Sequence, residues 1–106
     1  MDAFEAILTR RSTRKYAAEV PGKELIEKVI EAGRYAPSGG NSQTTHFLVI
    51  TDPDVLKELA WIVQTAFAKM EIQENTYASL KNSINASRRG GYVFHYNTPV
   101  LIVTAN

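Results

Sequence analysis

The sequence contains no cysteine, which excludes disulfides, thiolate catalysis and cysteine-based metal sites. Its two histidines, His46 and His95, have no second histidine or carboxylate at the spacing of metal ligands, so we expect no metal site. We also find no acid–base pair or nucleophile triad. The chain is therefore not expected to supply a catalytic side chain.

An excess of charge of either sign is also lacking. Twelve basic and 11 acidic residues give a net charge of +1, so no global field attracts nucleic acid or an anionic membrane. No apolar run approaches the roughly 20 residues of a membrane span, and the longest, 99–105, has the length of a strand. Residues 1–5 lack the basic start of a signal peptide. We expect a cytoplasmic protein that binds neither nucleic acid nor membranes.

Length and composition favour one globular domain over residues 1–106. Asp2 is a candidate N-cap for a first helix over 2–9, and polar residues without periodicity follow to position 19. An amphipathic helix has its apolar stripe from Leu25 to Ala32 and ends at Gly33 or Pro37.

The second half of the sequence contains two predicted strands and two further predicted helices. Residues 47–51 and 99–104 are apolar runs that predict two strands buried on both faces. Asp52-Pro53 begins a helix that continues to Met70. A further helix contains Tyr77, Leu80 and Ile84 and is broken by Arg88-Arg89-Gly90-Gly91. This order of helices and strands predicts α/β or α+β layers.

The last strand has only two residues after it, and no later helix to cover its faces. We therefore expect cover from a partner chain, or a natural protein that continues beyond Asn106. The short stripe Phe4, Ile7 and Leu8 would also be marginal alone. The aromatic residues are expected in the core or an interface, although the segment 92–96 is also suited to lining a substrate channel.

A basic cluster directly follows the first helix: Arg10, Arg11, Ser12, Thr13, Arg14 and Lys15. Guanidinium groups bind phosphate oxygens bidentately and keep their charge, and a serine hydroxyl adds a donor. Alone, the cluster is equally a solvated turn that complements the helix dipole. A nucleic-acid patch would need more positive charge and interleaved aromatic residues. A solvated turn is also the expected role of Arg88 and Arg89.

A polar, glycine-rich loop forms the second cluster: Ala36, Pro37, Ser38, Gly39, Gly40, Asn41, Ser42 and Gln43. Glycine lets backbone approach a flat ligand closely, and the Asn41 and Gln43 amides match the imide edge of a flavin ring. Alone, this composition is also that of an ordinary connector between a helix and a strand.

Together the two clusters resemble the N-terminal half of the nitroreductase family of flavoproteins. Arg-x-Ser-x-Arg is followed about two dozen residues later by Pro-Ser-x-x-Asn-x-Gln and a strand opening His-Phe. The resemblance implies an α+β fold of helix and sheet layers, with the C-terminal half of the fold absent from this chain. It also implies an intertwined homodimer with two shared FMN sites. The cofactor-binding residues it implies are Arg10, Arg11, Ser12, Arg14, Pro37, Ser38, Gly39, Asn41 and Gln43.

By the same resemblance, the first cluster holds the phosphate, the ribityl chain and the pyrimidine edge of FMN, and Arg14 reaches the ring. The loop covers that flavin from the opposite subunit, with Gln43 supporting it. The family often has Gln-Pro-Trp where this sequence has Gln43-Thr44-Thr45, which changes the substrate side. The part of the family fold beyond this chain supplies a donor near the flavin N5.

The function implied is electron transfer from NAD(P)H through flavin to nitroaromatics, quinones or similar flat acceptors. The alternative is a non-enzymatic truncated flavoprotein fragment, or an oligomerisation module that binds little or no FMN.

Overall fold

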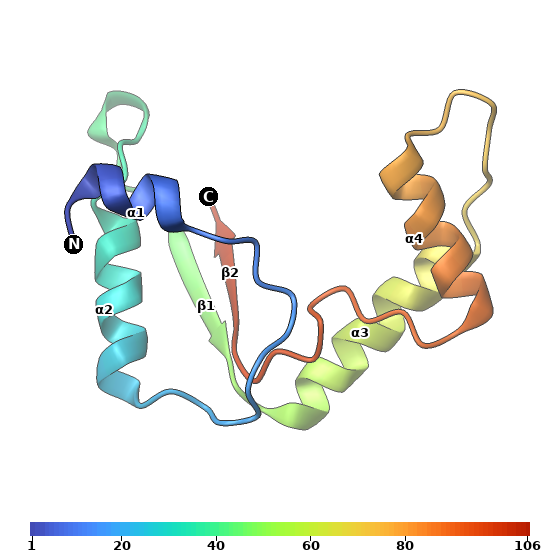
Figure 1. Cartoon of the computed structure of the whole chain (residues 1–106), viewed down its shortest axis with the longest axis horizontal. Helices are drawn as coiled ribbons and strands as arrows, with labels where there is room; N and C mark the ends of the chain where they lie inside the picture. Colours follow the sequence, from blue (N-terminus) through green and yellow to red (C-terminus); the bar gives the residue numbers. More distant parts are fainter.

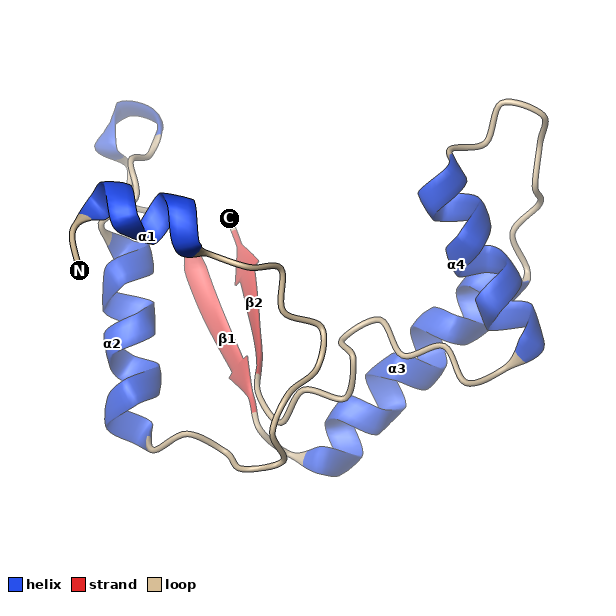
Figure 2. Ribbon diagram, in the orientation of Figure 1, coloured by secondary structure: helices blue, strands red, loops and turns tan.

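The computed structural model describes residues 1–106, which form two lobes (Figure 1). The sheet lobe, residues 1–52 and 99–106, holds two helices and a two-stranded sheet. The helical lobe, residues 53–98, is a hairpin of two helices (Figure 2). This mixture agrees with the predicted α+β class. No helix has the length and apolar character needed to cross a membrane.

The helices of the sheet lobe begin where the sequence predicts. Helix α1 spans Ala3–Thr9, and the Asp2 carboxylate caps it by accepting from the Glu5 amide at 2.8 Å. Helix α2 spans Lys23–Arg34, so Gly33 does not end it. A Cβ at Gly33 would lie 3.1 Å from the Phe47 ring, so glycine here allows α2 to approach the sheet.

The sheet consists of β1, His46–Ile50, and β2, Leu101–Ala105, paired antiparallel with Leu48 opposite Val103. The prediction that both strands are buried on both faces is wrong. Leu48 is 59% exposed and Val103 40% exposed. Because side chains alternate along a strand, Phe47 and Val49 face α2, and the opposite face of the sheet has little cover.

The helical lobe contains the core. Helix α3, Pro53–Ala68, starts with the Asp52 cap and Pro53 as predicted, and ends before Met70. Helix α4, Ala78–Arg89, packs against α3 and stops at Gly90, where φ is 87°. Buried residues occur only in this lobe. They are Leu56, Ala60, Ile84, Ser87 and His95.

The chain as a whole is open. Its radius of gyration is 16.9 Å, against about 13 Å for a compact domain of this length. Its accessible surface is 8840 Å², whereas a compact protein of this mass exposes roughly 5,900 Å². Most of the apolar surface of the sheet lobe is therefore available for contacts outside this chain.

Candidate functional site

The basic cluster lies on an exposed, irregular segment directly after α1. The Arg10 guanidinium donates to the Ser12 hydroxyl at 3.3 Å, so these two side chains already lie side by side. Arg10 is also the residue that ends α1. The helix end therefore presents a guanidinium and a hydroxyl together, which is the pair expected to hold a phosphate.

The other two arginines of the cluster have different surroundings. The Arg11 guanidinium donates back to the Thr9 and Arg10 carbonyls, at 3.4 and 2.9 Å. It thus satisfies carbonyls at the C-terminal end of α1, the dipole role that the sequence left open. Arg14 makes no hydrogen bond within the chain and lines a pocket against residues 86–97.

The loop between α2 and β1 is held in a defined conformation. A 3₁₀ turn spans Gly39–Asn41, and the Ser38 hydroxyl accepts from the Gln43 amide at 3.1 Å. Gly40, Asn41 and Gln43 all have φ between 52° and 59°. Two left-handed residues other than glycine in one loop are uncommon and mark a candidate functional segment.

The departure from the family at Gln43-Thr44 has a visible consequence. The Thr44 hydroxyl is hydrogen-bonded to the side-chain oxygen of Asn106, which ties the base of the loop to the end of β2. Pro37, Ser38 and Gln43 line a cavity of about 650 Å³ with Phe47.

The two predicted clusters are not brought together within one chain. No hydrogen bond joins residues 10–15 to residues 37–43, and the two segments line different pockets. Figure 1 shows the loop beyond the C-terminal end of α2, while residues 10–20 run along the other side of the sheet lobe. The chain by itself therefore contains no single site built from both clusters.

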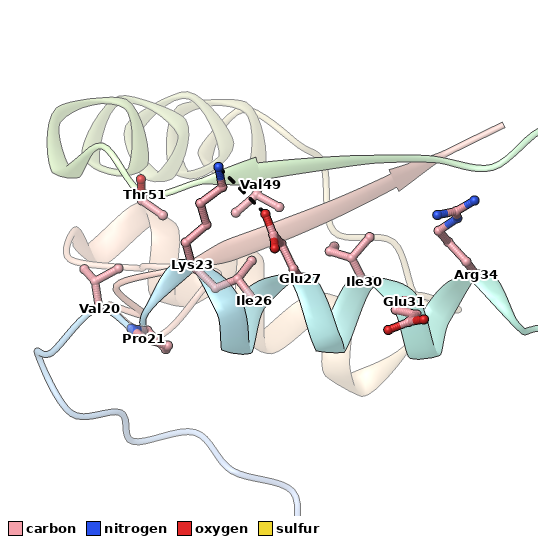
Figure 3. A pocket seen from close by; sticks show the side chains of 10 residues that line it. All are labelled: Val20, Pro21, Lys23, Ile26, Glu27, Ile30, Glu31, Arg34, Val49 and Thr51. Carbon is pink, nitrogen blue, oxygen red and sulfur yellow. Dashed lines mark ion pairs between the residues drawn. The ribbon is translucent and has the colours of Figure 1, made fainter.

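The groove between α2 and β1 contains none of the nine predicted cofactor residues (Figure 3). Its volume is about 650 Å³, with Ile26, Ile30 and Val49 as its apolar floor. Lys23 and Glu27 lie on its rim as an ion pair at 3.8 Å. The groove is a packing surface of the lobe rather than a collection of ligand-binding groups.

The donor set fits FMN in its chemistry. The Lys23–Glu27 pair is the only ion pair in the chain, so no carboxylate neutralises the guanidinium groups of the basic cluster. Guanidinium groups without an ion-pair partner beside a hydroxyl suit a phosphate, and the exposed amides of the loop suit the polar edge of a flat ring.

The sequence predicted no functional role for the end of α4, and for the loop that follows it only that residues 92–96 are suited to lining a substrate channel. Arg88 donates to the Ala68 and Met70 carbonyls, at 3.4 and 2.6 Å, and so caps α3 instead of lying free in a solvated turn. The loop beyond it contains four more left-handed residues, two of them glycines. The Gly-Gly and Tyr-Asn pairs were the available sequence signal. The four are Gly90, Gly91, Tyr96 and Asn97.

Comparison with known proteins identifies the family. The sequence model of the family described as "Nitroreductase family" matches residues 7–105 of this chain. A protein of Archaeoglobus fulgidus that carries the names NADH dehydrogenase and NAD(P)H nitroreductase is 41% identical over 59 residues, 56% of this chain and 34% of that protein. This chain therefore belongs to the nitroreductase family, as the sequence motifs predicted.

Solved structures agree with this assignment. A nitroreductase with bound FMN from Bacteroides fragilis superposes with a TM-score of 0.76 at 30% identity, over 95% of this chain and 50% of that one. A BluB-like flavoprotein from Clostridium difficile gives 0.71 at 29% identity, over 98% and 48%. The predicted nitroreductase-like α+β fold is confirmed, and the chain spans about half the length of these two structures.

Proposed function

We propose that the chain functions as part of an FMN-dependent NAD(P)H oxidoreductase of the cytoplasm. Its acceptors would be nitroaromatics, quinones or similar flat, electron-poor compounds. The observation that carries this proposal is the match of nearly the whole chain to a nitroreductase with bound FMN. The donors of the two clusters, none of which is neutralised by a carboxylate, give the match a chemical basis.

Each cluster has its own role in this proposal. Arg10 and Ser12 bind the phosphate, Arg11 contributes charge while it caps α1, and Arg14 reaches the ring. The loop of the opposite subunit covers the flavin. Bound FMN would accept hydride from the nicotinamide and pass electrons to the acceptor, so no protein nucleophile is needed. The loop residues are Pro37, Ser38, Gly39, Asn41 and Gln43.

We also propose a homodimer, which the same arrangement supports. The two clusters lie apart in one chain, and the exposed area exceeds that of a compact protein by about 2,900 Å². Obligate interfaces bury about 2,000 Å² or more in total, so the open surface is sufficient for one. Sedimentation at micromolar concentration should show a dimer or higher oligomer, and a well-folded monomer would contradict the shared site.

The cofactor is tested by comparing FMN with riboflavin, which lacks the phosphate. We expect FMN to bind more tightly, and Arg10→Ala to weaken FMN by about 1–3 kcal/mol, as for the loss of a charge-assisted hydrogen bond. Lys81→Ala is the control, since Lys81 is an exposed cation on α4 that lines neither cavity containing predicted flavin-binding residues. Equal affinity for the two flavins would contradict the phosphate role.

The second candidate is a non-enzymatic fragment or an oligomerisation module with little or no FMN binding. It is favoured by the small core, because only five of 106 residues are buried. Flavin absorbance in the purified chain distinguishes the two functions. A colourless chain that also fails to take up added FMN would support the second candidate.

A further inference from the structure

A shallow pocket lies where Arg14 meets the loop after α4. Its volume is about 380 Å³. Two of its lining side chains, Arg14 and Arg89, carry a positive charge, although they come from segments far apart in the sequence. No aspartate or glutamate lines it, and neither guanidinium has a hydrogen-bond or ion-pair partner in the chain. Two unneutralised like charges in one pocket favour an anionic occupant.

The backbone of this loop is held in place at a conformational cost. Tyr96 and Asn97 have φ of 55° and 57°, a region that side chains other than glycine rarely adopt. The loop is fixed to α3 by the Tyr92 amide, which donates to Gln64 Oε1 at 2.6 Å. His95 Nε2 lies 2.9 Å from the Leu56 carbonyl and adds a buried contact. Strained backbone that the surroundings hold in place is typical of binding sites.

The pocket wall also offers aromatic surface. Tyr92 and Tyr96 line it, and Tyr96 is 50% exposed. Tyrosine rings provide a flat contact area at low cost in side-chain entropy, while guanidinium groups bind a carboxylate or a similar planar anion. Charge and flat surface together define the chemical class of the ligand.

We propose that Arg14 and Arg89 form a binding site for a planar organic anion. The occupant that this pocket adds to the proposed function is an anionic aromatic acceptor, and the anionic ring of the reduced flavin, to which Arg14 is already assigned, is the competing source. Both sources rest on the proposed oxidoreductase function, and they share the same chemistry. Arg89 thus becomes a residue that selects for negative charge.

The test uses the full chain and two matched probes, 4-nitrobenzoate and its neutral isostere 4-nitrobenzamide. Binding is followed by NMR chemical shifts of the amides of residues 89–97. We expect the benzoate to bind about three- to tenfold more tightly, the effect of charge-assisted contacts at a partly exposed site. Arg14→Gln and Arg89→Gln should each remove most of this preference. Arg34→Gln, an exposed arginine outside the pocket, should leave it unchanged.

Equal binding of the two probes, no binding of either, or a full preference retained in Arg89→Gln would overturn the proposal. Reduced riboflavin, which has an anionic ring and no phosphate, then distinguishes the sources, with benzoate as the probe because a nitro group would itself be reduced. Displacement of bound benzoate assigns the site to the flavin ring, and simultaneous binding assigns it to an acceptor. Flavin uptake is measured separately by absorbance. A chain that takes up no FMN but shows the charge preference would refute the proposed function and leave the anion site supported.

Discussion

The two lobes of this chain are built from similar amounts of apolar sequence but differ in how much of it they bury. In the helical lobe, α3 packs against α4, and Ile84 is completely buried. In the sheet lobe no residue is buried, and side chains such as Phe4 and Leu48 are 71% and 59% exposed. A hairpin of two helices can bury one face of each helix internally, whereas a two-stranded sheet with α2 on only one side cannot cover both its faces.

The two lobes also differ in whether their stabilising contacts come from within the same lobe. Polar contacts in the helical lobe link residues of the same lobe, such as Arg88 to the end of α3 and Tyr92 to Gln64. The Phe67 and Tyr92 rings also meet edge to face at 5.8 Å. The sheet lobe is held mainly by the β1–β2 pairing and exposes its apolar faces. We expect the helical lobe to be the stable unit of the isolated chain, and the sheet lobe to gain stability from a partner surface.

The largest expected effect is that of a substitution in the helical core. Ile84→Ala should lower the free energy of unfolding by about 2–5 kcal/mol, since it leaves a cavity at a fully buried site. Leu48→Ala, in the exposed face of the sheet, should cost less than about 1 kcal/mol. Urea unfolding followed by circular dichroism measures both. Equal losses would show that the two lobes are equally packed.

The two histidines allow the same comparison with one kind of side chain. His95 is buried and contacts the Leu56 carbonyl, whereas His46 is exposed at the start of β1. His95→Leu should destabilise the helical lobe by about 1–3 kcal/mol through loss of a buried hydrogen bond. His46→Leu should change stability by no more than about 0.5 kcal/mol. A larger effect at His46 would reverse the assignment of the stable lobe.

The loop at 39–41 tests whether the sheet lobe has any rigid segment of its own. Gly40 has φ of 59°, so Gly40→Ala should strain the loop by about 1 kcal/mol and speed exchange of the Gln43 amide about fivefold. A Cβ at Gly39 meets nothing within 4 Å and needs no left-handed backbone, so Gly39→Ala should leave this exchange rate unchanged. The measurement is the hydrogen-exchange rate of the Gln43 amide in each variant, followed by NMR. Identical rates in both variants would mean that the loop is already mobile.

The smallest effect separates two adjacent arginines. Arg88→Ala should cost about 0.5–1 kcal/mol, because the guanidinium caps two carbonyls at the end of α3 from an exposed position. Arg89→Ala removes a side chain without such partners and should be neutral within about 0.5 kcal/mol. Thermal unfolding of the two variants provides the measurement. A loss at Arg89 equal to that at Arg88 would assign both to the packing of the hairpin.

Helix boundaries were the most predictable part of the fold. Asp2 and Asp52 cap α1 and α3 through their own carboxylates, and these are interactions between residues two or three positions apart. Gly90 ends α4 because its own φ is positive. The predicted end of α2 at Gly33 or Pro37 brackets the observed end at Arg34, and the role of Gly33 lies instead in its close approach to Phe47, a residue of the following strand. Rules for helix ends use only neighbouring residues, so they do not predict contacts between segments that are distant in the sequence.

The candidate site divides in the same way. The order of residues predicted the nitroreductase-family motifs at Arg10, Ser12 and the loop around Asn41, because each motif is local in the sequence. Their role in binding flavin stays a prediction. The order of residues did not show that Arg14 and Arg89 line the same pocket, or that Thr44 is hydrogen-bonded to Asn106, since both pairs join distant segments.

The sequence by itself determined the family, the helix caps and the chemistry of the donor groups, because propensity, capping and residue type act over a few neighbouring positions. Only the tertiary structure decided which apolar residues are buried. Both strands have the composition of buried strands, yet β1 and β2 remain half-exposed because burial depends on what packs against them. For the same reason the two clusters predicted to bind flavin lie in separate places in one chain, which the order of residues along the sequence could not show.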